Sequence, residues 1–298
     1  MKHFSNGEIK YAYSYLDEPV GRVSPSETFQ IGTQDCYTGL FRSPAGFTPE
    51  NIDWVGQNLD GVTGPIYVEG ATPGQVVAIS IHDIKVTTPG SVALSQYSYP
   101  SPEDWWLEEA ACKSYPIENN EIVFSDSVRI PVKPLIGCVA TAPAREVILS
   151  RHEGSYGGNM DCNEITVGST LILPVAVEGA YLYFGDCKAR MGDGEIAQPP
   201  EVGTLITASV ELRPAPARMH CPRIETREEL ITVVSARTIE DACREAFKEL
   251  LFWIEDDYSM ERQDAAMLMA MLAHAGICQV SNTFLTAKCK MPRAYLPH

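Results

Sequence analysis

Short β-type runs cut by glycine and proline dominate the chain from about residue 8 to about residue 235. The clearest runs are 76–81, 128–132, 171–177, 181–184 and 205–212. Turn signals such as Thr72-Pro73-Gly74 and Glu178-Gly179-Ala180 separate them, and this spacing is typical of a β-sandwich or a barrel. With 298 residues, the chain is long enough for one large domain or two modest ones with a buried core.

The periodicity changes near the C-terminus. Apolar residues recur with helical spacing after Thr238, which is placed to cap a helix, and Ser259 is placed to cap a second helix that ends at Gly276. We therefore expect a mainly β fold, a β-sandwich plus a barrel-like part, with a C-terminal two-helix α+β segment. The expected division is a β-rich core over 1–213 that carries the site, and an α+β segment over 214–298 packed on that core, joined by a stiff connector at 213–216.

Charge and composition exclude several classes of protein. The formal net charge is −16 without a basic run, so a nucleic-acid partner is not expected. The chain has no phosphate-binding glycine motif, so we expect no nucleotide-binding fold. It has no secretory signal at its start and no run of about 18 apolar residues, so we expect a cytoplasmic protein that does not bind a membrane. The nine cysteines lie scattered and unpaired in sequence, as buried thiols in a reducing compartment do.

One polar, glycine-rich stretch at 152–161 is a candidate for a functional loop. Gly157 and Gly158 allow a backbone to approach another group closely. Asn159 and Asp161 lie two residues apart and would face one side of an extended segment.

A second stretch, 185–195, places carboxylates beside glycine. Asp186 directly follows a strand, and Asp193 and Glu195 flank Gly194. Oxygen ligands at this density suit a divalent cation or a proton acceptor, whereas a glycine-rich hairpin with solvated acids gives the same pattern. Three further acids, Asp35, Glu69 and Asp83, stand at the ends of β runs, where turn-forming acids are also common.

Several of these segments, taken in order, resemble the acetamidase/formamidase family. The matching stretches are 64–74, 81–84, 157–161, 171–175, 185–195, 240–242 and 279–282. The resemblance implies a β-rich fold and hydrolysis of short amides such as formamide or acetamide to ammonia and a carboxylate. It also implies a bound divalent ion, Zn²⁺ or Ca²⁺, and a homo-oligomer, either a dimer or a tetramer.

The chain departs from the family pattern at two places. Lys188 stands where family members commonly carry His. An Asp that is often seen in the family before the Gln-Val segment is replaced here, with His274 at the nearest aligned position. The Lys188 ammonium could occupy the place of a cation. A diverged, non-catalytic small-molecule-binding protein and an amidohydrolase for another small linear or cyclic amide are therefore the alternatives.

For metal-assisted amide hydrolysis we assign roles as follows. Glu195 is the proton shuttle and Asp193 a second catalytic acid, while Asn159 or the Gly157 and Gly158 amides donate to the oxyanion. Gly157, Gly158 and Glu69 are expected to bind substrate. The predicted metal ligands are Asp35, Asp83, Asp161 and Asp186. If no metal is bound, Cys162 or a carboxylate pair becomes the candidate for the catalytic group. The segment 94–120, with Trp105-Trp106, is expected to cover the pocket or a subunit contact.

Overall fold

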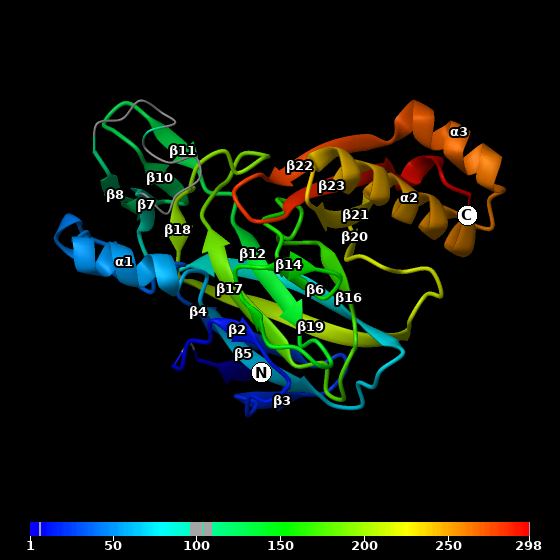
Figure 1. Cartoon of the computed structure of the whole chain (residues 1–298), viewed down its shortest axis with the longest axis horizontal. Helices are drawn as coiled ribbons and strands as arrows, with labels where there is room; N and C mark the ends of the chain where they lie inside the picture. Colours follow the sequence, from blue (N-terminus) through cyan, green and yellow to red (C-terminus); the bar gives the residue numbers. More distant parts are fainter. Residues whose placement is uncertain (6, 96–102, 104–108, 298) are drawn as a thin grey trace.

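Two nine-stranded sheets form most of the protein in the computed structural model, which describes residues 1–5, 7–95, 103 and 109–297 (Figure 1). The mainly β fold expected from the sequence is confirmed. The first sheet has the strand order β1 (Lys2–Phe4), β4 (Thr28–Thr33), β19 (Thr204–Pro214), β6 (Gln75–Val86), β16 (Thr170–Pro174), β20 (Arg223–Glu225), β21 (Glu229–Ala236), β23 (Leu285–Pro292) and β22 (His274–Gln279).

The second sheet carries the strands that build the candidate site. Its order is β14 (Glu153–Gly154), β15 (Gly157–Asn159), β12 (Leu135–Thr141), β17 (Leu182–Lys188), β18 (Glu201–Val202), β7 (Gly90–Leu94) and β8 (Ala111–Tyr115), while β5 (Val62–Val68) pairs with both β17 and β3 (Gly21–Val23). Smaller pairings join β9 (Ile117–Glu118), β10 (Glu121–Val123) and β11 (Arg129–Pro131), and β2 (Ala12–Tyr13) with β13 (Ile148–Leu149).

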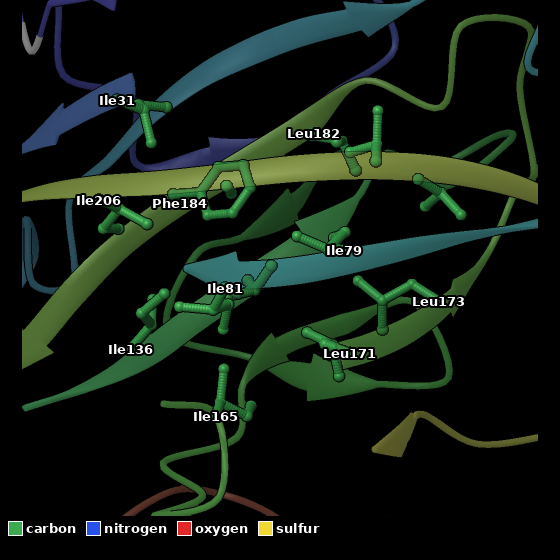
Figure 2. Packing of buried hydrophobic residues seen from close by; sticks show 14 of the residues in the cluster. Ile31, Ile79, Ile81, Ile136, Ile165, Leu171, Leu173, Leu182, Phe184 and Ile206 are labelled. Atoms are coloured by element: carbon green, nitrogen blue, oxygen red, sulfur yellow. The ribbon is translucent and has the colours of Figure 1, made fainter. Parts of the chain in front are cut away.

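The main hydrophobic core lies between these two sheets (Figure 2). Ile79 and Ile206 enter it from the first sheet, and Ile136 and Phe184 enter it from the second. All four side chains are fully buried. Alternation along each strand places the apolar residues inward, as in a sandwich of two packed sheets.

Three α-helices accompany the sheets among the described residues: α1 (Pro49–Gln57), α2 (Ile239–Tyr258) and α3 (Arg262–Leu272). Single 3₁₀ turns lie at Pro44–Gly46 and Arg293–Tyr295. The second and third helices lie over the end of the first sheet that contains β21 and β23 (Figure 1), where Leu250, Trp253 and Met291 form a separate core. Thr238 caps α2 as expected, because its side chain accepts a hydrogen bond from the Asp241 N–H.

Two expectations about the C-terminal helices are wrong. Ser259 does not cap the second helix: it ends α2 with a φ of 50°, and α3 begins only after Glu261. Gly276 does not end α3, which stops at Leu272, because Gly276 pairs with Lys288 inside β22.

The expected division at residues 213 and 214 falls inside a continuous structure. β19 extends to Pro214, so the expected connector is partly strand, and β20 to β23 continue the first sheet beyond it. The segment 94–120 contributes β8 to the second sheet, whereas Trp105 and Trp106 lie outside the described residues. No helix within the described residues has both the length and the apolarity needed to cross a membrane.

Candidate active site

A change in side-chain alternation on β17 creates the centre of the site. Asp186 has a φ of 51°, which shifts the alternation by one residue. As a result Phe184 and Cys187 both reach the hydrophobic core, whereas Asp186 and Lys188 face a polar cluster. A strand that is buried over its whole length thus carries both a core face and two charged groups.

Gly137 on β12 makes room for the carboxylates of this cluster. A Cβ atom at residue 137 would lie 2.4 Å from Asp161 Oδ1 and 2.4 Å from Asp186 Oδ2. Only a residue without a side chain fits there, because the neighbouring strand and both carboxylates approach the Cα directly.

Lys188 lies at the centre of four carboxylates, and we call Asp161, Asp186, Lys188, Glu195 and Glu201 the Lys188 cage. The ammonium donates to Asp161 Oδ1 at 2.5 Å and makes a short hydrogen bond to Asp186 Oδ2. It lies 3.5 Å from Glu195 Oε1 and 3.8 Å from Glu201 Oε1. Every side chain of the cage is at most 7% exposed, so water screens these charges poorly.

Burial and the lysine set the protonation of the cage. Burial alone would lower the pKa of Lys188, but the surrounding carboxylates, Asp161 first, raise it well above its usual value, so the ammonium stays charged. Burial raises the pKa of Glu195 and that of Glu201, although Lys188 opposes the rise in both. Burial also raises the pKa of Asp161 well above its usual value, so Asp161, Glu195 and Glu201 all hold a proton more readily than a solvated carboxyl group does.

The backbone holds several acids of the site in an uncommon conformation. Among the described residues, Asp60, Asp161, Asp186 and Glu195 all have positive φ, between 39° and 59°. Positive φ is uncommon outside glycine, and such residues concentrate at functional sites. The turns after α1 and β15, the irregularity within β17 and the turn before Glu195 therefore aim four carboxylates at one place.

A small, partly enclosed cavity adjoins the cage. Its volume is about 50 Å³. The lining residues are Leu59, Asp60, Asn159, Asp186, Lys188, Glu195, Gln198, Glu201, Ser281 and Asn282. Glu195 also lines an open surface pocket of about 330 Å³, so this side chain stands between the cavity and the outside.

Hydroxyl and amide groups complete the cavity. Ser281 Oγ donates to Glu195 Oε2 at 3.0 Å, and Asn159 Nδ2 donates to Asp60 Oδ2 at 3.3 Å. Asn282 Nδ2 donates to the Asn159 carbonyl at 3.2 Å, which joins the turn after β22 to the end of β15. The cavity thus brings carboxyl groups, hydroxyl and amide donors and one ammonium together in a small space.

Three buried groups beside the cavity could hold a metal ion. The ligand atoms of Cys36, Asp60 and Asp186 lie within 4.8 Å of one another. Burial raises the pKa of Cys36 and that of Asp60, and Asp186 Oδ1 has no hydrogen-bond partner among the described residues. A thiol with two carboxylates is a donor set that suits Zn²⁺ better than Ca²⁺, so these residues fit a zinc-like ion.

Some predicted site residues meet at this place. Asp161 and Asp186, predicted as metal ligands, and Glu195, predicted as the proton shuttle, lie in the Lys188 cage. Asn159 lines the cavity. Gly157 is built into the pairing of β15 with β12 and β14, where a Cβ would lie 2.2 Å from the Val139 carbonyl oxygen.

Gly158 lies in the same ladder, and a Cβ there would lie 2.2 Å from the His152 carbonyl oxygen. These two glycines therefore fit close strand packing, and neither lines the cavity.

Four predicted residues lie elsewhere. Asp35 is buried but its carboxylate accepts hydrogen bonds from Arg42 Nε at 2.7 Å and from the Gly39 N–H at 2.8 Å. Asp83 lies on an exposed position of β6, and Glu69 lies on the exposed turn after β5, where it accepts a hydrogen bond from Ser24. Asp193 contacts Lys288 instead of the cage, because the turn at Gly194 separates it from Glu195.

The sequence interpretation missed several residues of the site. Asp60 and Glu201 line the cavity. Cys36 lies close to Asp60 and Asp186, and Gly137 packs against the carboxylates of Asp161 and Asp186. Asp60 precedes a glycine and a strand, the pattern that singled out the other acids, whereas Glu201 follows two prolines and carries no such signal. Ser281 and Asn282 belong to a stretch that supported the family resemblance but received no role.

Comparison with known proteins finds that acetamidases and formamidases are similar to this chain. Residues 138–228 match the sequence model of the Acetamidase/Formamidase family. A putative formamidase of Schizosaccharomyces pombe is 25% identical in an alignment of 234 positions, and the match covers 59% of this chain. This chain spans 56% of the length of that curated relative.

Solved structures match over nearly the whole chain. An acetamidase of Bacillus halodurans is 29% identical with a TM-score of 0.91, and the match covers 98% of each chain. A predicted acetamidase/formamidase of Thermoanaerobacter tengcongensis is also 29% identical with a TM-score of 0.91, covering 99% of this chain and 96% of the other. The resemblance inferred from the motifs is thus confirmed in sequence and in fold.

Proposed function

From this acetamidase/formamidase-like sequence and fold, we propose that the protein is an amidase that hydrolyses the C–N bond of short linear amides to ammonia and a carboxylate. The small polar cavity carries the proposal. Its volume of about 50 Å³ compares with the roughly 10–15 Å³ that a cavity needs to hold one water molecule, so it admits a substrate of few atoms. Formamide and acetamide are amides of that size.

Glu195 has the position and environment of the proton shuttle. Its carboxyl lies between the cavity and the surface pocket, and burial raises its pKa toward the range in which it can both take and give a proton. We assign to Glu195 the removal of a proton from water as oxygen bonds to the amide carbon. The same group then gives that proton to nitrogen as the C–N bond breaks.

Polar donors of the cavity stabilise the charge that develops on the amide oxygen. Asn159 Nδ2 and the Lys188 ammonium line the cavity, and such donors in a water-poor site are typically worth about 10²–10³ in rate each. Cys36, Asp60 and Asp186 would hold a divalent ion, with Zn²⁺ favoured by the thiol. Such an ion, when bound, supplies Lewis-acid polarisation and a lowered pKa of bound water.

The assembly and the location of the enzyme are part of the proposal. We place it in the cytoplasm as a homo-oligomer, a dimer or a tetramer. All nine cysteines are free thiols, as suits a reducing compartment. Light scattering during gel filtration measures the oligomeric state, and a monomeric mass would contradict this part alone.

Ammonia release from amides of increasing acyl length tests the activity. We expect formamide and acetamide to be hydrolysed and kcat/KM to fall through propionamide and butyramide, because the cavity is small. Absence of ammonia from every linear amide would contradict the proposal. Ring opening of small cyclic amides, followed in the same series, would then identify the alternative substrate.

A further inference from the structure

The position of Lys188 within its cage resembles that of a bound metal ion. Its ammonium is surrounded by Asp161, Asp186, Glu195 and Glu201, which come from four separate parts of the chain, with Nζ–O distances up to 3.8 Å. An ammonium has three protons to donate, and in this cage it makes hydrogen bonds to two of the four carboxylates. The cage therefore offers more oxygen ligands than a lysine can use.

Several carboxylate oxygens of the cage also have no hydrogen-bond partner. Among the described side chains, Asp161 Oδ2, Asp186 Oδ1 and Glu201 Oε2 are buried without any hydrogen-bond partner. Buried polar atoms without partners are rare and costly in native proteins. A shell of carboxylate oxygens is the set that Mg²⁺, Ca²⁺ and Mn²⁺ prefer.

We propose that the Lys188 ammonium is the built-in cation of this cage and fills the place of a divalent ion. The protein therefore binds one divalent ion fewer than its buried carboxylates would otherwise hold. The inference concerns Lys188 and its four carboxylates. It is separate from the Cys36–Asp60–Asp186 group, whose thiol favours zinc, although the two sites share Asp186.

Replacement of the lysine by a small side chain tests the proposal. Wild-type protein and Lys188→Ala are equilibrated with Mn²⁺, passed through a desalting column and analysed for metal per chain. We expect Lys188→Ala to hold one Mn²⁺ more than the wild type, because an empty cage of four buried carboxylates attracts a cation strongly. Equal metal content in both proteins would overturn the inference, whatever the wild type itself binds and whether or not it hydrolyses amides.

Lys288→Ala is the matched control. Lys288 is also buried and paired with two carboxylates, but one of them, Asp193, is 56% exposed, so water can solvate the freed charge. We expect no additional Mn²⁺ in this variant. A gain equal to that of Lys188→Ala would mean that removal of any buried lysine creates a weak cation site, and would overturn the assignment of a built-in cation.

Thermal unfolding provides a second readout. Mn²⁺ at about 100 times its Kd should raise the Tm of Lys188→Ala by about 5 °C relative to its effect on the wild type. Propylammonium, which carries the ammonium that the variant lacks, should raise the same Tm and displace Mn²⁺. If Lys188→Ala folds only when Mn²⁺ or propylammonium is present, the proposal is supported. If Lys188→Ala and Lys188→Gln both stay unfolded with either cation, the cage does not accept a cation and the proposal is wrong.

Discussion

Two buried lysines of the described residues contact carboxylates, and the contrast between them separates the candidate active site from a structural ion pair. Lys188 is 2% exposed and its four carboxylates are at most 7% exposed. Lys288 is 1% exposed, and it contacts Glu164 and Asp193 at 2.7 Å each; we call Glu164, Asp193, Lys288 and Lys290 the Lys288 cluster. Its carboxylates are 16% and 56% exposed.

The protonation of the two groups differs accordingly. In the Lys288 cluster, burial alone would raise the pKa values of Glu164 and Asp193, but Lys288 lowers both below their usual values. In the Lys188 cage, burial outweighs the lysine and raises the pKa of Glu195. The exposure of the acids, more than that of the lysine, thus decides which group can transfer protons.

The largest expected effect is on catalysis. Glu195→Gln should lower kcat for acetamide by about 10²–10⁴, since the amide cannot transfer a proton. Glu164→Gln is the matched control in the Lys288 cluster, because it neutralises a buried, lysine-paired glutamate that does not line the cavity. Its turnover should stay within a few-fold of the wild type. Ammonia release measures both, and unchanged turnover in Glu195→Gln would remove its role as the proton shuttle.

The next largest effect is expected in the stability of variants that lack one of the two lysines. Lys188→Met leaves buried carboxylates without their cation and should lower the free energy of unfolding by about 3–5 kcal/mol. Lys288→Met should cost about 1–2 kcal/mol, because Asp193 is partly solvated and Lys290 still contacts Glu164 at 3.2 Å. Urea denaturation in metal-free buffer measures both values. Equal losses of unfolding free energy in both variants would show that the exposure of the carboxylates around Lys188 and Lys288 does not decide the cost of removing the lysine.

Two glycines beside these clusters give a smaller contrast. Gly137→Ala places a Cβ 2.4 Å from two cage carboxylates and 2.6 Å from the Asp186 carbonyl oxygen, so we expect a loss of about 1–3 kcal/mol together with loss of activity. Gly276→Ala places a Cβ 2.8 Å from Lys288 Cε, which belongs to a flexible side chain that can move. We expect a loss below about 1 kcal/mol and full activity. A Gly137→Ala enzyme as active as the wild type would show that the cage tolerates displacement of its carboxylates.

The sequence predicted this contrast only in part. Alternation and turn residues predicted the strands, and the N-cap at Thr238 predicted the start of α2, because these depend on local chemistry. The acids at strand ends included Asp161, Asp186 and Glu195. However, Asp193 and Glu195 stand two residues apart and lie in different clusters, since the positive φ at Gly194 and Glu195 turns the chain between them. Glu201 and Cys36 enter the site through tertiary packing, which no local pattern specifies.

The pH dependence of stability gives a further contrast between an acid near the cavity and an acid of the Lys288 cluster. Burial raises the pKa of Glu153, beside the cavity, to about 8, so the folded state binds its proton more tightly than the unfolded state. The stability from this group is therefore complete below about pH 4.5 and is lost as the pH rises toward 8. The free energy of unfolding changes by at most about 1.4 kcal/mol per pH unit through this one group.

Glu164 has the opposite sign, because Lys288 holds its pKa below 4.5 in spite of burial. Its contribution is present above about pH 4.5 and is lost as the pH falls through the lowered value. Glu153→Gln should therefore flatten the decline in stability between pH 4.5 and 8, and Glu164→Gln should flatten the decline on the acid side. Urea midpoints measured from pH 3 to 9 distinguish the two. Parallel curves for both variants would mean that the buried acids near the cavity are ion-paired like those of the Lys288 cluster, and that burial does not set their protonation.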